Sequence, residues 1–479
     1  MENEVYNKLW TEFIEKERKT FLKGKRKYVH FDNKIGFDDQ ILNNPAQFEL
    51  KFNARFKSDF YSSDKLLKSG FYPFIKVTKE VPRYKFDEVV GHRVTTLKSR
   101  PLCYASHFDA LRYSWYSTIL NYCYEGILKN ESFNKSVLAY RKLKEKASNI
   151  EFAFGAFKEI KDRKNCTALA FDISKFFDKI NHKVLYSNWV ATLKYIYPEI
   201  TELPSDHLKI YKNLTEFQFV SKPTLDDIFA DFSFFNESRN RFCTPKQFRE
   251  FIRGAKLIES NSSFLKSNDL SGGIPQGAPI SAVLANISMI DFDRKLYNLV
   301  TKLGGVYFRY SDDLLIIIEA EYKDEIKSKA EIFLREINLQ FNDKTEIINF
   351  REEGTKIVAT NESGNIKKLQ YLGFEFDGNK VYLRSSSLSK YHASMKNGVR
   401  KAISIAFGKY GDGKRVYKSK LLKKFTQSGK DNFIYYATRA NEINSEDKTI
   451  QKQYSKQYKH LNKSIKRKTE IKLKKKKTK

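Results

Sequence analysis

Two adjacent carboxylates, Asp312 and Asp313, are the residues of this sequence best suited to hold a divalent cation. They stand between two short apolar runs, 306–309 and 314–318, and this spacing predicts a β-hairpin with both acids at its turn. An adjacent acidic pair is by itself also typical of a solvated turn. The flanking runs would, however, draw both strands into a sheet core, where a charge is costly unless a partner compensates it. On local sequence alone, both interpretations stay open.

A third aspartate, Asp172, ends another apolar run. Residues 166–171 are predicted to form a short buried strand, and an amphipathic helix is expected to begin near Ser174. Carboxylates at a strand end and at a neighbouring turn can reach the same pair of metal ions, and Mg²⁺ prefers such oxygen ligands. Two divalent cations roughly 4 Å apart suit phosphoryl transfer to a hydroxyl. The three aspartates therefore form a candidate two-metal site.

The elements that would position these acids can be placed from the pattern of apolar residues. A glycine-rich loop covers residues 272–277. A helix is expected from Pro279 to about Leu303, and Gly304 and Gly305 would end it. A charged helix is expected over 321–339 and strand-like pieces over 371–376. The hairpin with Asp312 and Asp313 falls between these two helices.

Composition narrows the class of partner. The chain has 479 residues, 88 lysines and arginines against 57 acids, and a net charge of +31. The last 25 residues hold 12 bases and one acid, so the rest of the chain still carries +20. This excess favours a nucleic-acid partner over a small neutral substrate. No apolar run is long enough to span a bilayer, and four widely spaced cysteines are typical of reduced thiols in the cytoplasm.

Five segments resemble the sequence motifs of reverse transcriptases, in the order of that family. The segments are Phe171–His182 (the first catalytic motif), Gly273–Ser281 followed by Leu284–Asn286 (the PQG motif), Tyr310–Asp313 (the YxDD motif, here YSDD), and Asn342–Thr345 and Leu372–Phe374 (the two later motifs). With fingers motifs upstream, the resemblance covers residues 100–374, so a reverse-transcriptase palm is expected.

The resemblance implies roles at the catalytic centre. Asp172, Asp312 and Asp313 would hold two Mg²⁺ ions, with the carbonyl of Ile173 as a further ligand, and Mn²⁺ could replace Mg²⁺ in vitro. Phe177 stands five residues after Asp172, where the family places an aromatic side chain against the 2′ position of the sugar. A bulky ring there favours dNTPs and therefore DNA synthesis.

Further roles concern the nucleotide and the nucleic acid. By resemblance, Arg141 would grip the triphosphate, for which a guanidinium is well shaped. Gln276 and Gly277 would lie against the incoming nucleotide and the template base, and Lys344 would protonate the leaving pyrophosphate. Without the resemblance, Arg141 and Lys344 would be interpreted as surface charges. Template and primer contacts are expected from Arg100, Tyr310, Leu372 and Gly373.

The implied fold is α+β, a right-hand polymerase with fingers, a palm whose antiparallel sheet carries the YxDD hairpin, and a mostly helical thumb. The expected domains are a basic, mostly helical lead-in (1–80), fingers (81–165), a palm with an insertion at about 190–268 (166–374), a helical thumb or C-terminal domain (375–455), and a flexible basic tail (456–479).

The 105 residues after Phe374 would form a thumb and leave little room for an RNase H domain. The sequence also lacks the cluster of zinc ligands that would indicate an intron-type endonuclease. The segments Ala105–Ala110 and Ala139–Lys142 most resemble bacterial unknown-group and abortive-infection reverse transcriptases. That resemblance implies a cytoplasmic antiphage enzyme that extends a 3′-hydroxyl or a protein hydroxyl with dNTPs. Its partners would be an RNA template, often a co-encoded non-coding RNA, and the DNA product, and a homo-oligomer is allowed. The alternatives are a retron-type or group II intron-like enzyme, or a catalytically silent RNA-binding scaffold.

Overall fold

The computed structural model describes residues 2–87, 91–141, 148–229, 240–261, 272–343, 345–408, 416–445 and 447–477. The chain forms two compact units. Unit 1 consists of Met1–Arg141, Ile173–Asn298 and Ala330–Phe341, and unit 2 of Lys142–Asp172, Leu299–Lys329 and Asn342–Lys479. Within the described ranges, no helix is long and apolar enough to cross a membrane. All four cysteines are free and buried, as predicted.

Unit 1 opens with helices that are held together by aromatic side chains. The helices are α1 (Glu2–Leu22), α2 (Asp39–Asn43), α3 (Pro45–Phe60), α4 (Ser63–Lys68) and, after two strands, α5 (His107–Leu128). The phenylalanines of α3 recur every four residues and form one buried stripe: Phe48, Phe52, Phe56 and Phe60. Trp10 of α1 lies between this stripe and Trp115 of α5, with ring centroids 6.1 Å from Phe52 and 5.2 Å from Trp115.

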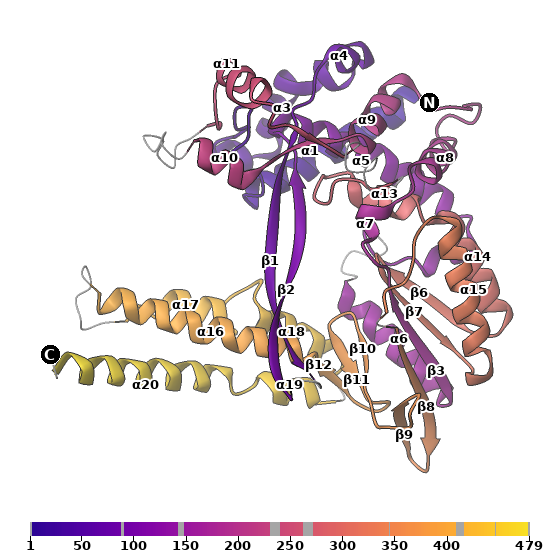
Figure 1. The fold of residues 1–479 in the computed structure, drawn as a ribbon, viewed down its shortest axis with the longest axis vertical. Coiled ribbons are helices and arrows are strands. Elements are labelled where there is room, and N and C mark those ends of the chain that lie inside the picture. Colours follow the sequence, from indigo (N-terminus) through magenta and orange to yellow (C-terminus); the bar gives the residue numbers. More distant parts are fainter. Residues whose placement is uncertain are drawn as a thin grey trace. The chain divides into compact units, whose positions relative to one another are not determined.

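A long antiparallel hairpin, β1 (Phe74–Asp87) and β2 (His92–Tyr104), follows α4 (Figure 1). The helical lead-in that was expected to reach residue 80 therefore ends before Phe74, and the prediction is wrong for residues 74–80. The sheet continues with β4 (Gln218–Ser221), parallel to β1, and β5 (Glu259–Ser260), antiparallel to β4.

The segment predicted as an insertion shares a core with the N-terminal part of the chain. Phe31 and Ile75 pack with Val220, Leu225 and Phe248 in one buried cluster. The remaining elements wholly within unit 1 are η1 (Ser132–Lys135), α7 (Phe176–Lys179), α8 (His182–Leu193), α9 (Ser205–Thr215), α10 (Lys222–Ile228), α11 (Pro245–Gln247), the π-helix η2 (Phe248–Gly254) and α13 (Ser281–Ile287).

The helix expected from Pro279 to about Leu303 is instead two helices, α13 and α14 (Ile290–Lys302). The break has a local cause. The buried Ser288 hydroxyl donates to the carbonyl of Ala285 at 2.9 Å, and Asn188 Nδ2 donates to the carbonyl of Ile287 at 3.1 Å. Side chains thus take carbonyls at the end of α13 that would otherwise continue the helix.

Unit 2 is built on a five-stranded antiparallel sheet in the order β6-β7-β3-β8-β9. Its strands are β3 (Cys166–Asp172), β6 (Val306–Tyr310), β7 (Asp313–Ile318), β8 (Glu346–Glu353) and β9 (Lys356–Asn361). The predicted hairpin is confirmed as β6 and β7, and the predicted strand as β3. Helix α6 (Asn149–Arg163), begun by a Ser148–Glu151 capping box, buries Ala153 and Phe157 with sheet residues of the same core.

The same core extends into a small antiparallel sheet and a group of helices. The elements are β10 (Leu369–Tyr371), β11 (Phe374–Phe376), β12 (Val381–Leu383), α16 (Ser385–Ala406), α17 (Ser419–Phe425), α18 (Phe433–Ile443), α19 (Thr449–Tyr454) and α20 (Gln457–Lys477). Two elements bridge the division between units, α14 and α15 (Lys323–Glu336), and η3 (Ala320–Tyr322) precedes α15. The chain is mixed in α and β structure, as predicted.

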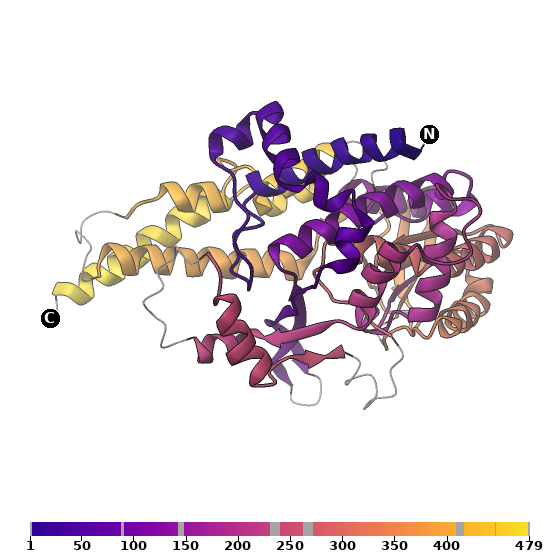
Figure 2. The ribbon, with the colours of Figure 1, turned by 90° about the horizontal axis from the view of Figure 1, so that it is seen from above.

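The basic tail, predicted to be flexible from residue 456, forms helix α20 as far as Lys477 (Figures 1 and 2). Leu461 and Ile465 explain the difference, because both are buried in the core that includes α16. Lysine is also a good helix former, so the charged residues do not oppose the helix locally.

Replacing Leu461 with Ala tests this packing. We expect the free energy of unfolding to fall by about 3 kcal/mol, the usual cost of such a cavity in a core. Denaturant unfolding followed by circular dichroism measures the change. Lys463→Ala, at an exposed position of the same helix, is the matched control and should leave stability nearly unchanged. Equal stability of both variants would show that α20 is not packed on the core.

Candidate active site

The register of two neighbouring strands brings two of the three aspartates together. In the antiparallel pair β3 and β7, Asp172 lies directly opposite Asp313. Directly opposite residues place their side chains on the same face of a sheet, only a few ångströms apart. Two carboxylates in that position repel each other, and a divalent cation between them would turn the repulsion into ligation. The arrangement therefore fits the predicted metal chemistry.

Asp312 lies in the turn that joins β6 to β7. Ser311, just before it, has a left-handed backbone with φ of 63°. The guanidinium of Arg309, which is wholly buried, donates to the carbonyl of Ser311 at 3.3 Å. A buried cation thus supports the strained turn from inside unit 2 and fixes where Asp312 and Asp313 emerge.

Asn342 holds Asp172 at two points. Its backbone N–H donates to the Asp172 carbonyl at 2.8 Å, and its side-chain amide donates to Asp172 Oδ2. Within the parts of the chain that the structure describes, no group of three or more His, Cys, Asp or Glu residues is arranged to hold a metal ion. Of the predicted set, the structure therefore pairs Asp172 with Asp313. Ile173, the predicted carbonyl ligand, is buried and bridges to Phe341.

The turn between β10 and β11 contains two more predicted site residues, Leu372 and Gly373, both with positive φ. Asn149 Nδ2 donates to the Leu372 carbonyl at 2.9 Å and to the Tyr436 hydroxyl at 3.0 Å. These two partners hold the turn in place. Asn149 and Tyr436 could not be identified from the sequence, because both lie far from Leu372 in the chain and neither belongs to a motif.

Tyr371, in the same part of unit 2, was also missed. Its hydroxyl is buried and has no hydrogen-bond partner among the described residues. Burial, reinforced by the charge of Asp313, raises the pKa of this phenol far above its usual value, so it stays protonated. Tyr310, predicted to contact template or primer, packs its ring 6.2 Å from that of Phe152.

In unit 1, the predicted nucleotide loop is held by backbone contacts. The N–H of Cys103, near the end of β2, donates to the Gln276 carbonyl at 2.8 Å. A Cβ at Gly277 would come within 2.9 Å of the Cys103 carbonyl, so only glycine fits there without a shift. The N–H of Ile274 donates to the Phe177 carbonyl at 2.9 Å. The structure therefore places Phe177 beside the Gln276–Gly277 loop.

A cavity of about 1070 Å³ lies next to this loop, within unit 1. Its lining includes Gln276, three lysines (Lys76, Lys175 and Lys179) and Asp178. Burial raises the pKa of Asp178, while Lys175 and Lys76 act in the opposite direction. The cavity thus combines cationic groups with the predicted nucleotide loop.

Arg141, which was predicted to grip the triphosphate, is not among the residues that line this cavity. Its five N–H groups are used internally: by Glu125 through two bonds of 3.0 and 2.8 Å, by the carbonyls of Asn134 and Val137, and by the Asn134 side chain. The side chain is 3% exposed. No donor is left for a phosphate, so in this structure Arg141 is a structural residue. Glu125 and the loop around Asn134 supply the reason, which the motif could not show.

Arg100 and Lys344 are the last two of the predicted site residues. Arg100 is exposed on β2, opposite Lys79 of β1. Lys344 lies outside the described residues.

Residues 225–376, about a third of the chain, match the protein-family model of the reverse transcriptase (RNA-dependent DNA polymerase). The chain contains a reverse transcriptase domain. The description of that family names an RNA-dependent DNA polymerase, the enzyme class that the sequence motifs predict. The matched segment includes the Gln276–Gly277 loop and the turn with Asp312 and Asp313, whereas Asp172 lies before it.

Solved telomerase structures show weak similarity. Telomerase from Candida tropicalis, truncated from its C-terminal domain, is 12% identical with a TM-score of 0.40, over 70% of this chain and 60% of that chain. Telomerase from Candida albicans in complex with a TWJ fragment of telomeric RNA is 11% identical with a TM-score of 0.38, over 91% of this chain and 64% of that chain. The chain thus spans less than two thirds of either telomerase. No curated protein matches the sequence significantly.

The Arg141 network makes a prediction that separates stability from nucleotide binding. Lysine cannot reach all of the acceptors that the guanidinium joins, so Arg141→Lys should lower the free energy of unfolding by about 2 kcal/mol. When Arg141→Lys is combined with Glu125→Gln, the free energy of unfolding should fall by less than the sum of the two single losses. Urea unfolding measures both. A normal stability together with a weaker dNTP affinity would instead restore the phosphate-binding role.

Proposed function

We propose that this chain is a reverse transcriptase that adds dNTPs to a hydroxyl primer with two Mg²⁺ ions, held by Asp172, Asp312 and Asp313 and by the carbonyl of Ile173. The observation that carries the proposal is the β3–β7 register, which sets Asp172 opposite Asp313. When bound, the metal ions lower the pKa of the attacking hydroxyl and stabilise the leaving pyrophosphate. The Asn342 amide fixes the orientation of Asp172, and the buried Arg309 supports the turn that presents the other two aspartates.

We assign the parts of a polymerase hand to elements of the two units. The five-stranded sheet of unit 2 would be the palm and helices α16–α20 the thumb, which holds the duplex. The β1–β2 hairpin would belong to the fingers. The strand order, with the turn carrying Asp312 at one end of a central antiparallel sheet, supports this assignment.

We assign nucleotide selection to Phe177 and the loop that its carbonyl holds. A ring at that position would clash with a ribose 2′-hydroxyl, while Gln276 and Gly277 would contact the nucleotide and the template base. Because Arg141 is used internally, Lys76, Lys175 and Lys179 are the cationic groups proposed to meet the triphosphate. Lys344 is retained as the proposed proton donor to pyrophosphate, and Arg100, Tyr310, Leu372 and Gly373 as contacts to template and primer.

For the biological role, we propose cytoplasmic antiphage defence with a co-encoded non-coding RNA as template. Support comes from the resemblance of segments Ala105–Ala110 and Ala139–Lys142 to defence-associated reverse transcriptases. The protein purified with its RNA and supplied with Mg²⁺ and labelled dNTPs should make DNA, whose sequence would identify the template. A DNA 5′ end joined to the protein would reveal a protein primer. A branched, RNA-linked product would instead indicate a retron-type enzyme.

Loss of the carboxylates should abolish this synthesis. Asp172→Asn, and the double change Asp312→Ala with Asp313→Ala, should each lower dNTP incorporation about a thousandfold, since metal-bound charge contributes several kcal/mol to the transition state. Chelation of divalent ions should do the same. Asp324→Asn, at an exposed acid of α15, is the matched control. Incorporation that survives the double change would refute the assigned centre and favour another source of activity.

Removal of the Phe177 ring should relax sugar selection. We expect Phe177→Ala to raise incorporation of rNTPs relative to dNTPs by about tenfold, because the side chain that excludes the 2′-hydroxyl is gone. The ratio of the two kcat/KM values on one primer is the measurement, so a general loss of activity cancels. Phe177→Tyr, which keeps the ring, should retain the wild-type ratio. An unchanged ratio for Ala would remove Phe177 from its proposed role.

A further inference from the structure

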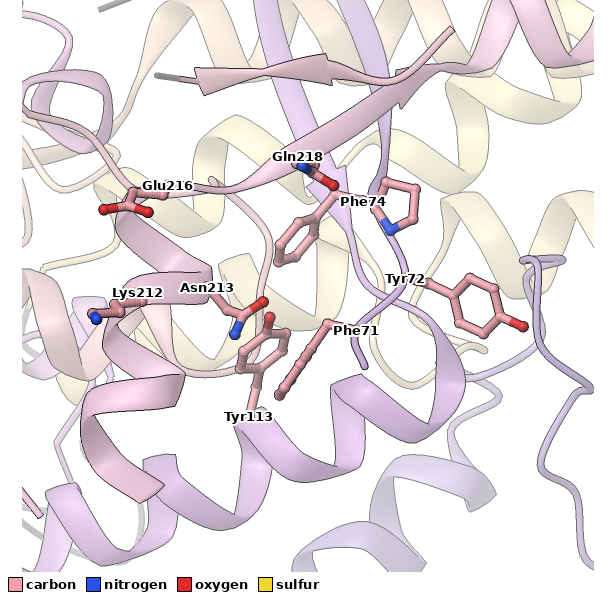
Figure 3. A pocket seen from close by; sticks show the side chains of 9 residues that line it. Phe71, Tyr72, Phe74, Tyr113, Lys212, Asn213, Glu216 and Gln218 are labelled. Carbon is pink, nitrogen blue, oxygen red and sulfur yellow. The ribbon is translucent and has the colours of Figure 1, made fainter. Parts of the chain in front are cut away.

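A second pocket of unit 1, of about 270 Å³, is walled by aromatic rings (Figure 3). Phe71, Phe74 and Tyr113 form the wall, with the centroid of Tyr113 5.7 Å from each of the other two rings. Phe74 and Tyr113 are nearly parallel, at 13°. The two are buried, whereas Phe71 is partly exposed at the pocket. The partly exposed Phe71 ring is therefore the surface on which a planar ligand could stack.

The Phe71 ring is fixed by a second contact. The guanidinium of Arg112 lies 5.0 Å from the Phe71 centroid. Arg112 is itself held by Asp109 at 3.0 Å and by the carbonyl of Gly70 at 3.3 Å. A ring that is already ordered loses little entropy when a ligand stacks on it, so the platform is preorganised.

Polar groups border the same pocket. Asn213 of α9 donates its Nδ2 to the Lys209 carbonyl at 2.9 Å, which leaves its Oδ1 as an acceptor toward the rings (Figure 3). Gln218 of β4 adds a carboxamide that can both donate and accept. Lys212, one residue before Asn213, brings an exposed positive charge to the rim, and Glu216 a negative one.

Stacking rings, carboxamides and an ammonium group are together the chemistry that recognises an unpaired nucleobase and its phosphate. The volume is at or below the lower limit for pockets that hold drug-sized ligands, which suits one base better than a larger cofactor. The charge of +31 favours a polyanion as the source of that base.

Strand β4 connects this pocket to the proposed nucleotide cavity. Gln218 lines the small pocket, while its neighbours Phe217 and Phe219 line the cavity that contains Gln276. Consecutive residues of a strand face opposite sides, so one strand contributes a wall to both. A single-stranded template that leaves the cavity around Gln276 would find the small pocket on the other face of β4.

We propose that the pocket walled by Phe71, Phe74 and Tyr113 binds an unpaired base of the RNA template. This inference rests on the proposed function, because it takes RNA as the template. The site is built partly by the 190–268 segment, so that segment contributes to template binding.

The test uses the full chain and a single-stranded RNA labelled with 4-thiouridine. Ultraviolet cross-linking followed by mass spectrometry should place the RNA on the peptide that contains Phe71 or on the one that contains Tyr113. Phe71→Leu, which retains apolar bulk but removes the ring face, should weaken RNA binding about tenfold. Gln218→Glu, at an exposed position, should weaken binding by repelling phosphate. Gln47→Glu, an equal charge change at an exposed position of α3, should have a smaller effect.

Phe251→Leu, at an exposed phenylalanine of unit 1 that does not line the pocket, is the control for the loss of a ring. It should leave the affinity for RNA unchanged. Unfolding midpoints show whether Phe71→Leu is folded, and Gln218→Glu tests the site if it is not. Cross-links confined to other peptides, or equal affinities for all variants, would overturn the proposal. If the pocket variants lost affinity for single-stranded DNA but not for RNA, the assignment of RNA as the ligand would be overturned. A failure of the proposed polymerase function can be told apart from a failure of this proposal. The double variant Asp312→Ala, Asp313→Ala should lose DNA synthesis but still cross-link to the RNA.

Discussion

The pairing of β3 with both of its neighbours is the constraint on which the candidate active site depends. β3 is the central strand of the unit 2 sheet, bonded to β7 on one side and β8 on the other. Since side chains alternate along a strand, a slip of one residue would send Asp172 to the opposite face and separate it from Asp313. The register is specified by apolar packing: residues 314–318 of β7 are entirely buried. A polar site is thus positioned by a run of five buried apolar residues in β7.

In unit 1 the corresponding constraint is close backbone approach. A Cβ at Gly272 would lie 2.4 Å from the Ile180 carbonyl, and one at Gly273 would lie 2.6 Å from that of Asp178. The His182 ring donates from Nε2 to the Gly273 carbonyl at 2.7 Å. The glycines of this loop therefore serve packing against the 178–182 turn, quite apart from any contact to a nucleotide. A substitution there would move the loop and Phe177 together.

The sequence was sufficient to predict the elements whose signal is local. The hairpin of β6 and β7 and the strand β3 have short apolar runs with clear boundaries. The β1–β2 hairpin was missed because apolar and polar residues alternate only from Ile75 to Thr78, after which Lys79 and Glu80 break the pattern and Pro82 argues against a central strand. β4 pairs with β1 only at residues 74–76. Pro82 is tolerated because it lies beyond these residues, where this edge of β1 is not paired with β4. Tertiary pairing of this kind has no local signature.

Arg141 shows the same limit at a site residue. Its motif position says nothing about Glu125 or the Asn134 carbonyl, and those partners decide what its guanidinium can bind. If lysines around the 1070 Å³ cavity meet the triphosphate instead, recognition changes in kind. An ammonium group is a strongly hydrated point charge on a flexible stem, whereas a guanidinium fixes two oxygens in one plane. Orientation of the nucleotide would then depend less on its phosphates and more on the Gln276–Gly277 loop and Phe177, which the backbone of unit 1 already holds in place.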